Sequence, residues 1–183
     1  MYFFAFMLAV LFVGLALHVA LDRSPARRTA PRVLELVALW FVVWGIGVNG
    51  VLAGLVHTGP GAASAAAEIG FLPTPFQWEV GVNDLAVGIA GVLCARRSLR
   101  GGWMSATVAV AFVSLWGDAI GHVMQLVAHD DTAVNNVWAM PIGFGVPLVA
   151  AIALVASRRS ARAAAAASTP DREPAGRHAH VPA

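Results

Sequence analysis

The sequence WGDAIGHVMQ, residues 116–125, decides how this chain must fold, because it sets an acid, a histidine and an amide into an otherwise apolar run. Asp118, His122 and Gln125 are followed by His129 at spacings of four, three and four residues, so one helix face carries all of them. Ionisable groups at membrane depth are costly, and they face a bundle interior or a wet cavity rather than lipid. The stretch therefore predicts a helix that packs in a bundle around a buried polar site.

The composition is that of a polytopic membrane protein. Of the 183 residues, 58% are hydrophobic and 12% are charged, whereas soluble domains carry about 25% charged residues. We expect an all-α, five-helix transmembrane domain over residues 1–157 and a disordered cytoplasmic tail over residues 158–183. Each span needs roughly 20 apolar residues. The five spans are predicted at about 2–21, 33–57, 75–96, 103–128 and 138–157.

All 12 basic residues are arginine, and their positions predict the orientation of the chain. They lie in the first connection, around the third connection and after the last span, and the second and fourth connections contain none. The positive-inside rule then places the N-terminus outside and the C-terminus inside the cell membrane. No basic stripe is interleaved with aromatic residues, so we expect no nucleic-acid partner. The single cysteine, Cys94, excludes an internal disulfide and a cysteine-based metal cluster.

The third span is expected to face the WGDAIGHVMQ helix with polar groups of its own. Glu79 and Asn83 are four residues apart and share a face, and Asp84 is rotated by about 100° from Asn83. At about 1.5 Å of rise per residue, Glu79 lies near the outer boundary and the other polar groups about 9 to 15 Å below it. We therefore expect one cluster that opens toward the extracytoplasmic side. Its deeper members are Asn49, Asn83, Asp84, Asp118 and His122.

The expected site combines carboxylate, amide and imidazole groups. Glu79, Asp118 and His122 are the candidate catalytic residues, and these three with Asn83 are the candidate metal ligands. Oxygen and nitrogen donors without sulfur suit Zn, Fe, Mn or Cu and do not select among them. Metal-free acid/base chemistry and a buried network that only fixes helix packing are the alternatives. Supporting positions are predicted for Asn49, Asp84, Gln125 and His129.

Small residues predict where helices approach one another. Gly50 and Gly54 form a pair with three residues between them, and Gly117 and Gly121 form another beside the polar residues. Such pairs permit close helix packing in membranes. Both pairs therefore allow a second helix to approach closely.

The connection between the second and third spans is expected to contain a short interfacial helix within residues 62–69. After it, Thr74 and Gln77 match a capping box, which would commit the Gln77 side chain to the start of the third span. In the last span, Pro141 and Pro147 predict a kink or local unwinding.

Two resemblances are carried by these motifs. The pattern P-x-P-F-Q-x-E-x-G at residues 73–81, followed by G-x-x-x-G-H at 117–122, resembles that of a family of small bacterial integral-membrane proteins of unknown function. That likeness covers about residues 71–150 and implies the fold without an activity. The pair Asp118 and His122 is similar to the membrane copper site in the C subunit of particulate methane and ammonia monooxygenases, although His129 follows sooner than that pattern expects. This second likeness implies copper by analogy alone.

The leading functional hypothesis is a small membrane enzyme that acts on a lipophilic substrate. The first alternative is a transporter or a proton- or ion-conducting protein that uses the same carboxylates as a relay. A relay needs polar groups that continue to the inner face, and there the third and fourth spans offer little beyond Ser105, Thr107 and Ser114. The second alternative, favoured by the small size and the glycine-rich faces, is an accessory subunit or homo-oligomer in a larger membrane complex.

Overall fold

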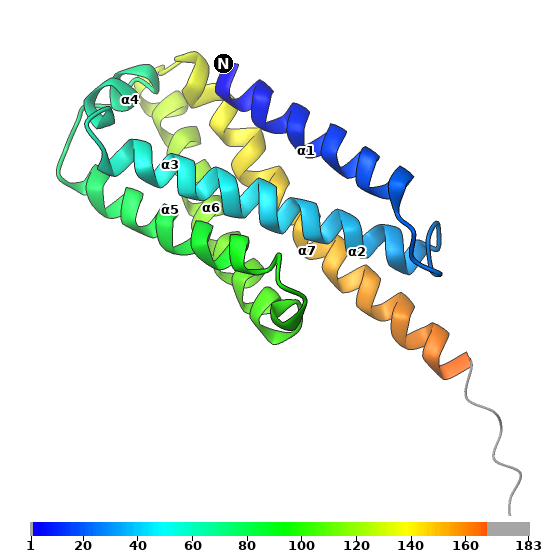
Figure 1. The fold of residues 1–183 in the computed structure, drawn as a ribbon. Helices are drawn as coiled ribbons and strands as arrows, with labels where there is room; N and C mark the ends of the chain where they lie inside the picture. The colour runs from blue at the N-terminus through cyan, green and yellow to red at the C-terminus, as the bar shows by residue number, and fades with distance from the viewer. Residues whose placement is uncertain (1, 168–183) are drawn as a thin grey trace, which may run out of the picture.

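The computed structural model describes residues 2–167, and every regular element within that range is helical (Figure 1). The second long helix is continuous but changes from α to π and back, so it carries three labels. The elements are α1 (Tyr2–Leu21), α2 (Ala30–Trp40), the π-helix η1 (Phe41–Val48), α3 (Asn49–Thr58), α4 (Ala62–Glu68), α5 (Phe76–Leu93), the short 3-10 helix η2 (Arg97–Leu99), α6 (Gly102–His129) and α7 (Val134–Ala167).

Four helical stretches are long and apolar enough to cross a membrane, namely Phe3–Leu21, Ala30–Thr58, Gly102–His129 and Val134–Ala167. The all-α fold, with several helices long and apolar enough to cross a membrane, is therefore confirmed. Helix α5 has 18 residues but is less apolar than the other four, because it carries charged and amide side chains in its first half. A fifth span, formed by α5, stays a prediction.

Helix α7 extends further than the sequence predicts. It continues through Ala167, so residues 158–167 are helical and do not belong to a disordered tail. The rest of the predicted tail, residues 168–183, lies outside the described residues. The helix is also continuous through Pro141 and Pro147, so the predicted unwinding is wrong. The carbonyl oxygen of Phe144, between the two prolines, accepts a hydrogen bond of 3.1 Å from the Trp116 indole of α6.

Helices α3 and α5 lie side by side (Figure 1), and facing glycines join α5 to the second long helix along η1 and α3; we call this contact the glycine seam. A Cβ atom added to Gly91 would lie 2.7 Å from the Cα atom of Gly47, and one added to Gly54 would lie 2.6 Å from the Gly81 carbonyl oxygen. Only glycine permits backbones to approach this closely. The predicted close packing at Gly50 and Gly54 is thus confirmed. The seam pairs Gly47 with Gly91, Gly50 with Gly88, and Gly54 with Gly81.

The second glycine pair behaves differently. A Cβ atom added to Gly117 or Gly121 would meet nothing within 4 Å, so within residues 2–167 no helix packs closely against that face of α6. The close approach that this pair would allow does not occur in the described part of the chain. The space that these two glycines leave open is part of a cavity, described below.

The apolar core fills the middle of the bundle. Leu11 of α1, Val42 and Ile46 of the second long helix, Ala111 of α6 and Ala150 of α7 are almost completely buried in one cluster. Indole hydrogen bonds attach α1 to this core, because Trp44 donates to the Met7 carbonyl at 2.9 Å and Trp40 donates to the imidazole of His18 at 3.0 Å. The tryptophans and His18 therefore have structural partners.

Replacing Gly91 by alanine tests the glycine seam. The new methyl group would press on the backbone of the second long helix, so we expect a loss of about 1 to 3 kcal/mol in unfolding free energy. Gly145→Ala is the matched control, because its added Cβ atom meets nothing within 4 Å. Alanine has the higher helix propensity, so the control should be neutral or stabilising. Equal behaviour of the two variants in detergent unfolding would contradict a tight seam.

Candidate functional site

A cavity of about 450 Å³ lies at the end of the bundle where α3 finishes and α5 starts. Its walls come from α3, α5, α6 and α7, and its cover comes from α4 and the segment after it. Ala66 of α4 and the segment residues Ile69 and Phe71 all contribute to the lining. The predicted short helix at 62–69 is confirmed as α4, which covers part of this end of the cavity. The polar residues of the lining are Asn49, His57, Thr74, Gln77, Asp84, Asp118, His122 and Gln125.

Helix α6 supplies one polar wall. Asp118, His122 and Gln125 line the cavity together, as their shared helix face indicates. Asn49 of α3 lines it from the opposite side. His129, at the end of α6, is exposed and takes no part in the lining. The predicted downstream histidine is therefore not part of the site.

Helix α5 presents a different face from the one that the sequence predicts. Glu79 and Asn83 are exposed and do not line the cavity, and the Asn83 amide donates to the Ser114 hydroxyl at 2.6 Å. Asp84, expected only in a supporting position, is 9% exposed and lines the cavity. The prediction that Glu79 and Asn83 form the α5 wall of the site is therefore wrong, and Asp84 lies there instead.

The glycine seam explains this rotation. Gly81, Gly88 and Gly91 follow one another at helical spacing on the α5 face that packs against η1 and α3. Asp84 shares that face, because it lies three residues after Gly81 and four before Gly88. When the glycines pack against α3, Asp84 is carried inward and Glu79 is carried outward. The spacing of Asp84 with the glycines is the signal in the sequence that identifies it.

His122 has a partner that sequence reasoning missed. Its Nδ1 atom lies 2.6 Å from Oδ1 of Asn136, which is fully buried in the first turn of α7. The Asn136 amide nitrogen donates to the carbonyl oxygens of Asp131 at 2.9 Å and His122 at 3.4 Å. Because the amide nitrogen is committed to acceptors, Oδ1 must accept from a protonated Nδ1. In the neutral ring the acceptor lone pair is then on Nε2.

The cover of the cavity contacts the site directly. The Phe71 ring lies 5.4 Å from the His122 imidazole, centroid to centroid, with the planes 31° apart. The Gln77 amide donates to the Ala62 carbonyl at 2.6 Å and lies 3.2 Å from Nδ1 of His57. The start of α5 has no side-chain cap, so the predicted capping box is wrong. Gln77 instead connects α5 to α4 and to His57.

The ionisable groups of the cavity are close enough to interact electrostatically. Asp118 interacts with Asp84 across the cavity and with His122 one turn along its own helix. His57 interacts with His122. Two carboxylates and a tautomerically fixed imidazole therefore share one apolar-walled space, and this is an arrangement suited to binding a polar group and transferring a proton.

The metal prediction is not supported. Within residues 2–167, no group of three or more His, Cys, Asp or Glu side chains is arranged to hold a metal ion. The candidate ligands Glu79 and Asn83 lie outside the cavity, so Asp118 and His122 are not completed into the predicted ligand set. The likeness to the monooxygenase copper site gains nothing from this geometry.

Comparison with known proteins identifies the family. The chain belongs to a family of unknown function, DUF6790, which it matches over residues 1–163. This agrees with the resemblance to a family without an assigned activity. No curated protein and no solved structure matches the chain.

The variant Asn136→Ala tests how His122 is held. Losing the buried acceptor leaves Nδ1–H unpaired, so we expect a loss of about 1 to 3 kcal/mol in stability and a shift toward the Nε2–H tautomer. Nitrogen NMR of labelled histidine reports the tautomer directly. Asn135→Ala is the matched control and should keep the tautomer of the wild type. A wild-type His122 that is already protonated on Nε2 alone would contradict the assignment.

Proposed function

We propose that this protein is a membrane enzyme that binds a lipophilic molecule in the cavity and performs acid/base chemistry on a polar group of that molecule. His122 is the proposed base and acid through Nε2, and Asp118 is the proposed carboxylate that stabilises the charged imidazole. Asp84 replaces Glu79 as the second acidic group. The observation that carries the proposal is the cavity in which Asp84, Asp118 and His122 meet.

The size and lining of the cavity support a small amphiphilic ligand. Its volume of about 450 Å³ falls within the range of about 300 to 1,000 Å³ typical of small-molecule sites. Leu115, Ile142 and Val80 give it apolar walls, and the ionisable groups gather on α5 and α6. Such a lining favours a ligand with an apolar body and one polar end.

The side chain of Asn49 favours a ligand that carries a hydrogen-bond donor. Its Oδ1 atom is buried and has no hydrogen-bond partner among the described residues. A buried acceptor without a partner is costly, by about 1 to 3 kcal/mol. Asn49 lines the cavity, so a hydroxyl or amine group of the ligand would satisfy it. The same group would then lie within the space shared by Asp118 and His122.

The packing below the cavity favours an enzyme over a relay. On the second long helix, Val42 and Ile46 separate Asn49 from Glu35, and on α6 Val108 and Ala111 separate Asp118 from Met104. These core residues are buried at the level where a relay would need polar groups, and the hydroxyl of the buried Thr107 donates to the Trp103 carbonyl oxygen of its own helix at 3.0 Å. A cavity that ends against an apolar core suits binding and chemistry.

The topology we propose has five spans, with α5 as the third and the N-terminus outside. Support comes from α5 lying along α3 and from the arginines of the first and third connections, which meet α7 at the end of the bundle remote from the cavity. If that end is cytoplasmic, the cavity faces the extracytoplasmic side.

Filling the cavity tests whether it binds a molecule. A Cβ atom added at Gly121 or at Gly145 meets nothing within 4 Å, so Gly121→Leu starts its side chain in the open space of the cavity, and Gly145→Leu adds the same side chain away from the cavity. Native mass spectrometry should find a bound organic molecule in the wild type and in Gly145→Leu, and at least tenfold less in Gly121→Leu. Equal occupancy in both variants would exclude the cavity as the site.

The identity of the retained molecule tests for catalysis. Asp118→Asn keeps the shape of the cavity but removes the charge that stabilises the imidazolium. If the protein is an enzyme, this variant should retain unreacted substrate, whose covalent structure differs from any molecule carried by the wild type. If wild type and Asp118→Asn retain the same molecule at the same occupancy, the protein binds the molecule without transforming it.

A further inference from the structure

The opposite end of the bundle contains a second pocket that the proposed function does not use. It has a volume of about 300 Å³ and lies between α2, the start of α6 and the last turns of α7. Three arginines from three parts of the chain reach it, namely Arg32, Arg100 and Arg158, together with the single carboxylate Glu35. The lining therefore carries three positive charges and one negative charge, a net charge of +2.

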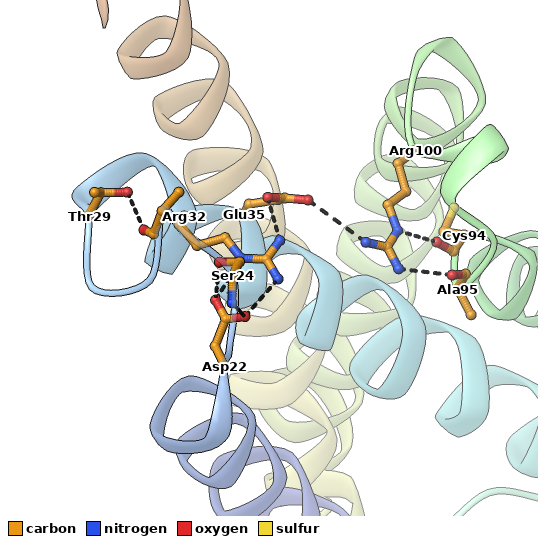
Figure 2. Close-up of polar contacts among 9 residues, drawn as sticks. Asp22, Ser24, Thr29, Arg32, Glu35, Cys94, Ala95 and Arg100 are labelled. Carbon is orange, nitrogen blue, oxygen red and sulfur yellow. Dashed lines mark hydrogen bonds and ion pairs between the residues drawn. The ribbon is translucent and has the colours of Figure 1, made fainter.

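Arg32 is already neutralised by carboxylates. Its Nε atom lies 2.9 Å from Asp22 and its Nη1 atom lies 2.8 Å from Glu35, as Figure 2 shows. The Arg32 guanidinium holds the pKa of the Asp22 carboxyl well below its usual range, so Asp22 is charged at neutral pH. Arg32 thus lines the pocket with its charge balanced by Asp22 and Glu35.

The other two arginines have weaker counter-charges. Arg100 donates to the carbonyl oxygens of Cys94 at 3.4 Å and Ala95 at 2.9 Å, and its nearest carboxylate, Glu35, is 3.8 Å away (Figure 2). Arg158 donates only to neutral acceptors among the contacts that the structure gives it. These are the Ser105 hydroxyl at 2.5 Å and the carbonyl oxygens of Gly101 at 2.7 Å and Arg100 at 3.3 Å.

The hydrogen bonds hold both guanidinium groups in place before any ligand arrives. Planar guanidinium groups match the oxygens of a phosphate in pairs, and fixing them in advance reduces the entropy lost on binding. Arg97 and Arg32 add to the positive potential at Arg100. The polar end of the pocket is therefore built for an anion with several oxygen atoms.

The remaining lining is apolar. Leu39 of α2, Met104 of α6 and Leu154 of α7 lie on the core side of the arginines, in helices that span the membrane. A ligand that fills the pocket thus meets positive charge at the end of the bundle and apolar side chains toward the membrane interior. Basic pockets between membrane helices at this level bind anionic lipid head groups.

We infer that this pocket binds the head group of an anionic phospholipid. The phosphate lies between Arg100 and Arg158, and the first part of an acyl chain runs along Leu39 and Leu154 toward the core. The site exists whichever way the chain is inserted, and its place in the inner leaflet rests on the orientation proposed above. Binding here attaches the long helix α7 to α2 and to the start of α6.

The experiment uses the purified full chain, stripped of lipid in a neutral detergent. Phosphatidylglycerol, phosphatidylcholine and inorganic phosphate are added separately, and binding is followed by native mass spectrometry and by the thermal midpoint. Only phosphatidylglycerol should bind and raise the midpoint. Arg158→Gln should weaken that binding about tenfold, the scale of one charge-assisted contact. Arg159→Gln is the matched control, because Arg159 is next to Arg158 in the chain but is exposed and lies outside the pocket. This variant should bind phosphatidylglycerol as the wild type does.

A second variant protects the test against misfolding of Arg158→Gln. Ser105→Ala removes the hydroxyl that holds Arg158 without changing the charge of the pocket, and it should weaken phosphatidylglycerol binding to a smaller extent. Equal binding of phosphatidylcholine, or equal losses in Arg158→Gln and Arg159→Gln, would overturn the inference. An effect of inorganic phosphate as large as that of the lipid would show a site for a soluble anion and would also overturn it. None of these outcomes bears on the cavity at the other end of the bundle.

Discussion

The close contact of α3 with α5 along facing glycines determines which residues of this protein meet one another. Van der Waals packing and hydrogen bonds, rather than hydrophobic burial, drive helices together in a membrane, so the closest backbone contacts fix how each helix is rotated. Gly81, Gly88 and Gly91 place one side of α5 against η1 and α3 of the second long helix. Asp84 lies on that side and reaches the cavity, whereas Glu79 is turned away from it. The rotation of one helix thus selects the acidic group of the site.

Helix α6 also has a pair of glycines, but these leave an open space beside the helix and do not pack against another helix. Gly117 and Gly121 have no neighbour within 4 Å of an added Cβ atom, and both line the cavity beside Asp118 and His122. The opposite outcomes for two Gly-x-x-x-Gly pairs follow from their partners. Facing glycines on α5 allow the first pair to close, whereas α4, Phe71 and the side chains of α5 stand across from the second. The same short motif therefore makes a tight seam in one place and a cavity in another.

Much of the fold is predictable from the sequence, because long apolar runs and the i, i+4 spacing of Asp118 with His122 depend only on local periodicity. The extent of α1, the short helix α4 and the shared face of α6 follow in this way. The rotation of α5 cannot be predicted in this way. Glu79 with Asn83 defines one face of the helix and Gly81 with Asp84 defines another, and only the position of α3 decides which of the two faces inward. Asn136 is also hidden from the sequence, since its contact with His122 depends on how α6 and α7 cross. The π-helical turn at Phe41–Val48 has no local signal that we can name.

We propose that Asp118 lies in a water-filled cavity reached from the extracytoplasmic side, although its helix is long and apolar enough to span a membrane. This central claim is tested most directly by comparing Asp118→Cys with Val113→Cys, a position on the same helix that is 75% exposed and should face lipid. Both are made in a Cys94→Ser background, and a charged thiol reagent that does not cross membranes is added to intact cells. The account predicts that Asp118→Cys is modified and Val113→Cys is not. An unreactive Asp118→Cys, or modification of Val113→Cys at the same rate, would contradict it.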